Sequence, residues 1–259
     1  MCPLVPPIEN PCRVVAVSPL TRSTFLIELE ARDTPEYRPG QYLQMSVEVD
    51  GQTHTLFYSI ANRPDARNPN RLELIIQCGS DFSRALLERL NELFLNGRPL
   101  PVTLPLGQAF LQTDLKQPHL LVASGSGISK IRCIAAEILS RYPEADVRVY
   151  WSNRDSENFY LLEEFSRWQQ DHRNFRFTPV LESPAAHWSG RTGYLSDVIK
   201  ADHVSLHQTY GYLCGSPQMV YGTLDQLAVI GLQEGQCYSD VFEFSPRVGE
   251  SKNVVLEPA

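Results

Sequence analysis

The hydrophobic pattern of the chain changes near Pro118, and this change limits the possible folds more than any other feature. After Pro118, short and nearly continuous apolar runs alternate with longer amphipathic segments, as expected for buried parallel strands joined by helices. The pattern predicts a parallel sheet with helices on both faces. The predicted strands are His119–Ser124, Asp146–Asn153, Phe175–Leu181 and Thr209–Ser216; the predicted helices are Ile131–Tyr142, Asn158–His172, Thr192–Lys200 and Pro217–Gly231; and Gln236–Phe244 ends the series.

Before Pro118 the pattern is that of short strands separated by turn residues. Each run is apolar or alternating and is rich in β-branched and aromatic residues, which predicts an antiparallel barrel of six strands. A helix from Asp81 to Leu95, with leucines at three- and four-residue steps, is expected to cap one end of this barrel. The six runs are Cys12–Leu20, Ser23–Ala31, Gln41–Val49, His54–Asn62, Arg71–Cys78 and Pro101–Leu106.

Length and composition suit one large domain or two domains of ordinary size. The chain has 259 residues, 42% of them hydrophobic, which is enough for two cores. We place a barrel domain at residues 10–114, an α/β domain at 115–245 and a tail at 246–259. The tail is either a mobile end or a lid.

The charge and the termini exclude several classes of partner and location. A net charge of -7 without a basic block argues against nucleic acid or an anionic membrane as the main partner. No apolar run approaches the roughly 20 residues that span a membrane. The N-terminus lacks the features of a signal peptide, so we expect a cytoplasmic protein.

The cysteines do not have the spacing of a metal site. The chain has 6 cysteines and no C-x-x-C pair, so we expect no metal ion or iron–sulfur cluster. We expect five of them to be structurally plain. Cys214 is the exception, because it stands at the end of a predicted strand.

A glycine turn follows the first strand of the predicted parallel sheet. The apolar run Leu120–Ala123 leads into Gly125, Ser126 and Gly127, and an amphipathic helix begins at Ile128. Such a turn has two interpretations. It either makes a simple corner between strand and helix, or it holds a phosphate on the free amides of the helix N-terminus.

Two further strand ends are expected at the same edge of the sheet. Ligands of open parallel sheets bind beyond the carboxyl ends of the strands. A dinucleotide would place its pyrophosphate on the glycine turn, its ribose or adenine near Arg154, and its reactive ring near Cys214. Arg154 is either a phosphate contact or a surface arginine, and Trp151 is either a core residue or a contact.

In the first half, the run His54–Asn62 places Tyr58 and Ser59 at a strand end before a loop. An aromatic ring and a hydroxyl at such a point can stack on a flat heterocycle and hydrogen-bond to it. The alternative is an ordinary tyrosine at the rim of a barrel.

Eight short segments, taken in their order along the chain, resemble the ferredoxin-NADP reductase superfamily. The resemblance covers nearly the whole length, from Cys12 to Phe244. The likeness is greatest to the compact bacterial NAD(P)H:flavin oxidoreductases. The ending CYSDVFEF, and Lys130 where many relatives have proline, favour that subgroup. The segments are RPGQYL, YSIA, LELII, PLGQAFL, LLVASGSGISKIR, VYWSNRDSENFYLLEEF, WSGRTGYL and YLCGSPQMV.

The resemblance implies a site made of two parts. Ser59 would lie near the flavin N5 and Cys214 beside the nicotinamide, and these two are the predicted catalytic residues. The predicted flavin contacts are Tyr58, Ser59, Ile60, Gly79 and Phe244, and the predicted nucleotide contacts are Gly125, Ser126, Gly127, Arg154, Cys214 and Gly215.

The resemblance further implies hydride transfer from NADH or NADPH to FMN, FAD or riboflavin, free or loosely bound. Reduced flavin or electrons would then pass to an oxygenase or another acceptor.

Two departures from the family pattern leave alternative functions open. Leu56 replaces the arginine that contacts the flavin phosphate or ribityl region in the family, and Ser124 replaces a glycine. The alternatives are a reductase subunit with tightly bound FAD, and a non-catalytic binding or regulatory relative.

Overall fold

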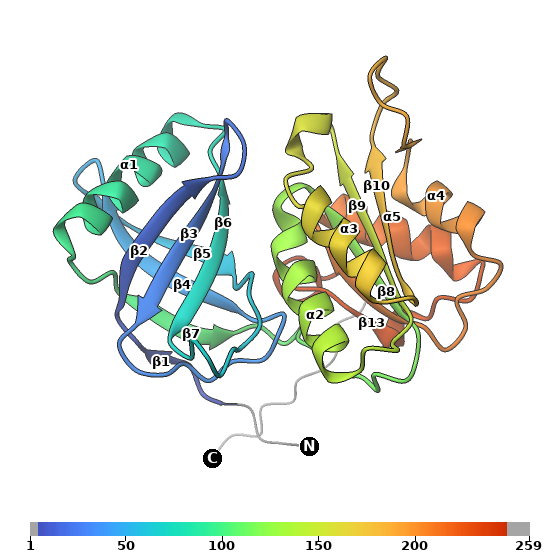
Figure 1. Cartoon of the computed structure of the whole chain (residues 1–259), viewed down its shortest axis with the longest axis horizontal. Coiled ribbons are helices and arrows are strands. Elements are labelled where there is room, and N and C mark those ends of the chain that lie inside the picture. Colours follow the sequence, from blue (N-terminus) through green and yellow to red (C-terminus); the bar gives the residue numbers. More distant parts are fainter. Residues whose placement is uncertain (1–4, 248–259) are drawn as a thin grey trace.

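The computed structural model describes residues 5–247 of the chain. It has two parts that meet side by side: the antiparallel strands with α1, and the parallel sheet with its helices (Figure 1). The predicted tail at residues 246–259 lies outside the described residues except for its first two positions. The domain boundaries at residues 114 and 245 stay a prediction.

The first part contains two antiparallel sheets, ordered β1-β7-β4-β5 and β2-β3-β6. Alternate side chains of both sheets point into a common core that includes Ile27, Leu43, Met45 and Leu74. All six predicted strands are present, and β1 is an addition. The strands are β1 (Ile8–Glu9), β2 (Cys12–Pro19), β3 (Thr24–Ala31), β4 (Tyr42–Val49), β5 (Gln52–Ser59), β6 (Arg71–Gln77) and β7 (Val102–Leu106).

The strand pairing divides the predicted six-stranded barrel between two sheets. Within residues 5–247, no ladder joins β5 to β6; one backbone hydrogen bond, from Ala61 N to Glu73 O at 2.8 Å, crosses between them. The connection between these strands contains Pro64 and Pro69, which lack an N–H to donate, and it is too long for a tight hairpin. At the other edge, an isolated bridge pairs Cys12 with Leu100.

Helix α1 (Asp81–Asn96) covers one end of these sheets and packs on β2 and β4. It begins with a capping box between Ser80 and Ser83. It ends at Gly97, whose φ of 66° is left-handed. Its buried face confirms the predicted period, with Leu86, Leu90 and Leu93 buried.

The second part is a parallel sheet in the order β11-β10-β9-β8-β12-β13. Helices α2 and α3 cover one face and α4 and α5 the other, which confirms the predicted layers. The strands are β8 (His119–Ser124), β9 (Val147–Asn153), β10 (Phe175–Leu181), β11 (Arg191–Thr192), β12 (Tyr210–Cys214) and β13 (Cys237–Tyr238); the helices are α2 (Ile128–Arg141), α3 (Leu162–Asp171), α4 (Leu195–Asp202), α5 (Pro217–Ala228) and α6 (Val241–Phe244).

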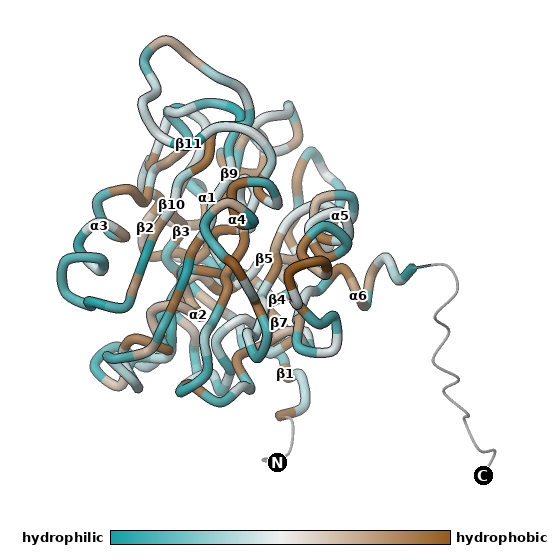
Figure 2. The backbone as a smooth tube through the Cα atoms, turned by 90° about the vertical axis from the view of Figure 1, so that its right-hand side faces the viewer, coloured by the Kyte–Doolittle hydropathy of each residue, from teal (hydrophilic) through white to brown (hydrophobic). Residues whose placement is uncertain are grey.

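The two parts share apolar contacts. Ala61 and Ile75, from the antiparallel part, belong to the same buried cluster as Ile131 and Ile134 of α2. From the side, Figure 2 shows α6 beside α5, with hydrophobic residues gathered in the strands and hydrophilic residues in the outer loops. No helix within residues 5–247 has the length and apolar character that a membrane crossing requires.

Candidate functional site

The glycine turn is a short 3₁₀ turn, Gly125–Gly127, between β8 and α2. A Cβ at Gly127 would lie 2.3 Å from the carbonyl oxygen of Cys214, so only glycine fits where the turn meets the end of β12. Gly125 has a φ of 52°, which also favours glycine. Ser124 has ordinary extended angles, φ -122° and ψ 138°, and therefore tolerates its side chain without strain.

At the start of α2, the Ile128 amide donates to Gly125 O and Ser126 O within the turn. The N-cap Gly127 supplies no side-chain cap, and Ser126 is exposed beside it. Trp151 is fully buried and donates from Nε1 to Gly125 O at 2.8 Å, so it is a core residue that supports the turn. Backbone amides on a rigid turn at a helix N-terminus suit a phosphate.

A cavity of about 240 Å³ lies at the end of β12, and we call it the β12 pocket. Burial raises the pKa of Cys214 to about 11, while Lys130 lowers it and Asp240 raises it. Cys214 is therefore a neutral thiol at physiological pH. The pocket is lined by Cys214, Gly215, Pro217, Ser239, Asp240, Val241, Phe244 and Ser245.

Because Gly215 has no side chain, the side chains of Met219 and Ser124 pack closely against it. A Cβ there would lie 2.3 Å from Met219 Cε and 2.4 Å from Ser124 Oγ. The side chain of Ser124 therefore fills the space beside Gly215, which brings the ends of β8 and β12 into contact.

Lys130 and Asp240 form an ion pair beside this pocket. The sequence analysis did not predict this pair. The Lys130 side chain is 2% exposed, and its Nζ lies 2.6 Å from the Asp240 carboxylate. It also donates to Ala109 O at 3.2 Å. The one local signal is a lysine on the apolar face of a predicted helix, four residues before Ile134.

The end of β5 carries the other half of the predicted site. Ser59 pairs with Tyr42 of β4, and Tyr58 pairs with Leu43. Because side chains alternate along a strand, Ser59 and Phe57 point to one face, and Tyr58 and Leu56 to the other, where they pack against the core. Burial, and then the Cys78 thiol, raise the pKa of Tyr58 to about 12.

An aromatic rim, consisting of Tyr42, Phe57 and Phe244, joins the two halves. The ring of Tyr42 lies 6.0 Å from that of Phe57 and 5.9 Å from that of Phe244. Phe57 and Phe244 are 54% and 64% exposed, so both offer apolar surface to a ligand. Because Phe244 also lines the β12 pocket, its ring connects that pocket to Tyr42, the strand partner of Ser59.

The loop after β7 tightens this junction. A Cβ at Gly107 would lie 2.5 Å from Tyr42 Cε1 and 3.5 Å from Asp240 Oδ1. Gly107 therefore packs between the antiparallel part and the segment that leads into α6.

Four predicted site residues lie apart from this junction or turn inward, and one of them is Tyr58, whose ring packs against the core. The side chain of Ile60 is fully buried, so only its backbone is available. Gly79 comes directly before the N-cap of α1. In that helix, Phe82 packs on His54, which lies near the end of β5 opposite to Ser59. Arg154, at the end of β9, has an 86% exposed side chain that lies 3.5 Å from Glu182.

The chain is similar to several known proteins. A family model described as an oxidoreductase NAD-binding domain matches residues 121–225. The chain is 28% identical over 236 residues to the NAD(P)H-flavin reductase of Aliivibrio fischeri, covering 90% of this chain and 98% of the relative. It is similar in structure to the Amycolatopsis cytochrome P450 reductase GcoB, with a TM-score of 0.80 and 26% identity over 92% of this chain and 70% of that one.

A third relative has slightly higher identity. It is a probable flavin reductase of Vibrio harveyi, 30% identical over 237 residues, which cover 90% of this chain and 99% of the relative. The chain therefore belongs to the flavin reductase family.

Proposed function

We propose that this chain is an NAD(P)H:flavin oxidoreductase, which transfers hydride from a reduced nicotinamide nucleotide to a flavin. The observation that carries the proposal is the aromatic rim, because Phe244 belongs to the β12 pocket and contacts Tyr42, the strand partner of Ser59. Two flat rings held on either side of that point would lie close enough to react. Family membership supports the same reaction.

The residues present fit a nicotinamide nucleotide. The backbone amides near Ser126 and Gly127 would bind the pyrophosphate. The close approach of Gly127 to Cys214 would place the pyrophosphate next to the end of β12. Cys214 and Gly215 would border the nicotinamide in the β12 pocket. Arg154 would meet the ribose end of the nucleotide, where Glu182 offsets its charge.

The residues present also fit a flavin ring, but they offer it fewer charged contacts than the family pattern implies. Ser59 and Phe244 are the proposed ring contacts, with the backbone of Ile60. Tyr58, on the core face of β5, and Gly79, near the N-terminus of α1, would contact other parts of the flavin. Phe57, the exposed aromatic on the face of Ser59, joins the ring contacts. Leu56 packs against the core and offers no charge to a phosphate, so we propose a loosely held flavin.

The flavin, when bound, supplies the hydride acceptor. The protein aligns the two rings, and the apolar surfaces of Phe57 and Phe244 exclude water from between them. The Ser59 hydroxyl would donate a hydrogen bond at the reacting edge. Cys214 is a neutral thiol and would act by packing beside the nicotinamide rather than as a nucleophile.

Steady-state oxidation of NADH and NADPH, with riboflavin, FMN and FAD added in turn, tests the proposal. We expect colourless or faintly yellow protein that oxidises the nucleotide only when flavin is added. The absence of oxidation with every flavin would contradict the proposal.

Transfer of electrons to a protein acceptor is a second candidate function, favoured by the structural likeness to a cytochrome P450 reductase. In that case the purified protein would be yellow and would reduce a protein acceptor without added flavin. The non-catalytic alternative loses one of its two supports, because Ser124 sits in ordinary extended backbone.

A further inference from the structure

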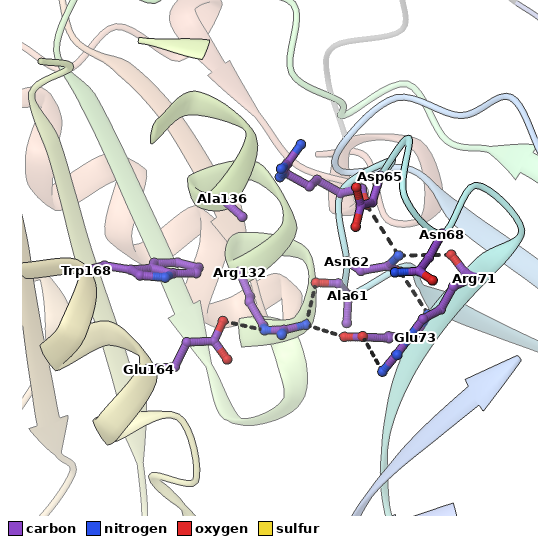
Figure 3. A pocket seen from close by; sticks show the side chains of 11 residues that line it. Ala61, Asn62, Asp65, Asn68, Arg71, Glu73, Arg132, Ala136, Glu164 and Trp168 are labelled. Atoms are coloured by element: carbon purple, nitrogen blue, oxygen red, sulfur yellow. Dashed lines mark hydrogen bonds and ion pairs between the residues drawn. The ribbon is translucent and has the colours of Figure 1, made fainter. Parts of the chain in front are cut away.

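A polar cluster at the junction of the two parts is centred on Arg132 (Figure 3). Arg132 lies in α2, five residues after Gly127. It donates from Nε to Glu164 Oε1 at 2.7 Å, and from Nη1 to Glu73 Oε2 at 2.7 Å and to Ala61 O at 3.1 Å. One side chain therefore joins α2 to α3, to β6 and to the segment after β5.

The cluster is partly buried, lines a cavity of about 280 Å³, and has paired charges. The side chain of Arg132 is 20% exposed, and those of Glu164 and Glu73 are 20% and 12% exposed. Burial alone would lower the pKa of Arg132, but Glu164 and Glu73 raise it above its ordinary value. Arg71 lies 3.0 Å from the second oxygen of Glu73. Loss of Arg132 would leave Glu164 without its cation and Glu73 with Arg71 alone, which is costly in a partly buried site.

Ala61 connects this cluster to the proposed flavin site, because it lies two residues after Ser59. The barrel side of the segment is held by hydrogen bonds from Ile60 N to Gln41 O at 3.1 Å and from Ala61 N to Glu73 O at 2.8 Å. From the side of α2, it is held by Arg132 and by Cys133, whose Sγ lies 2.9 Å from Asn62 O. The segment is therefore fixed from both parts of the molecule.

We infer that Arg132 is a positioning residue for hydride transfer, which fixes the strand end carrying Ser59 relative to the glycine turn that begins α2. This inference rests on the proposed function. Arg132 does not line the β12 pocket, so it acts through Ala61 and Gly127 rather than on the reacting rings. The planar guanidinium is suited to this role because it reaches three acceptors from one rigid group.

The kinetic test compares Arg132→Met with Arg173→Met, which removes an exposed ion pair to Glu144 instead. In anaerobic single turnovers at saturating NADH and flavin, we expect Arg132→Met to lower the hydride-transfer rate about 10- to 100-fold, as expected for a misplacement of about 1 Å. The Kd for NADH should stay within about threefold. Arg132→Lys keeps the positive charge but lacks the several donors of the planar guanidinium, so it should recover only part of the lost rate.

The deuterium isotope effect separates positioning from simple destabilisation. With NADH deuterated at C4, we expect a larger isotope effect on kcat in Arg132→Met, because hydride transfer then limits turnover more strongly. A smaller folded fraction would lower the rate without changing the isotope effect. The inference is overturned if the wild type is active and Arg132→Met matches Arg173→Met in rate and isotope effect. An inactive wild type would instead contradict the proposed function.

Hydrogen exchange of the protein without added flavin or nucleotide provides a readout independent of activity. We expect the amides of Ile60 and Ala61 to exchange about tenfold faster in Arg132→Met. Unchanged exchange overturns the inference. If Arg132→Met does not fold, Glu164→Ala removes one anchor only, and an unchanged hydride-transfer rate in that variant overturns the inference as well.

Discussion

At the residue scale, Ser59 is the side chain with the most specific proposed role. It ends β5 and pairs with Tyr42, whose ring contacts Phe244 at the edge of the β12 pocket. Ser59→Ala should lower kcat about tenfold, which corresponds to about 1.4 kcal/mol, because one hydrogen bond at the reacting edge is lost.

Steady-state kinetics with varied flavin check this prediction. The KM for flavin should change less than about twofold, since uniform binding is unaffected. Ser46→Ala, on the same face of β4, is the matched control. Equal kcat values for the two variants would rule out the role of Ser59.

Lys130 is the second residue with a specific expectation. Its side chain is almost fully buried and paired with Asp240, so Lys130→Met leaves a carboxylate without its partner. The free energy of unfolding should fall by about 3 kcal/mol. Urea unfolding measures this change, with Lys200→Met as the control, because Lys200 forms a more exposed pair with Asp197.

Adding Asp240→Asn to Lys130→Met should restore part of that stability, because neither buried charge then remains. If Lys130→Met unfolds at the same urea concentration as Lys200→Met, the pair contributes little to the fold.

At the scale of elements, the glycine turn is fixed by its contact with the end of β12. The strand, turn and helix around it could be predicted from the sequence, because a continuous apolar run and a helical period are local signals. The phosphate role of the turn stays a prediction from the order of the motifs, because the contact of Gly127 with Cys214 explains the glycine by packing alone. The structure shows that Gly127 has no room for a side chain.

Gly127→Ala should therefore lower the free energy of unfolding by about 1 to 3 kcal/mol, since a Cβ overlaps the Cys214 carbonyl. Gly222→Ala is the control, because it lies in α5 with open space around it and should be neutral or slightly stabilising. Equal urea midpoints for the two variants would contradict the packing described for the turn.

Other elements show what a local pattern cannot predict. The strands β1, β11 and β13 have two residues each, too few for a periodic signal. The open edge between β5 and β6 was missed because strand pairing depends on contacts between distant residues, whereas the pattern identifies only the strands themselves.

At the scale of the whole molecule, the order of the motifs predicted two parts and a site between them. The residues that hold the parts together were not predicted. Lys130 and Asp240 are 110 positions apart, and Arg132 and Glu73 are 59 apart. A charged residue within a helical pattern suggests a solvated face until its distant partner is known. These pairs therefore required the three-dimensional structure.

The central claim is that the junction between the two parts aligns a nicotinamide with a flavin. Its most direct test is an anaerobic titration of the protein with NADH in the presence of one equivalent of flavin, followed by absorbance. We predict that the flavin band bleaches with the loss of one NADH per flavin, at a rate that increases with protein concentration. A flavin band that persists, with NADH absorbance unchanged, would contradict the claim.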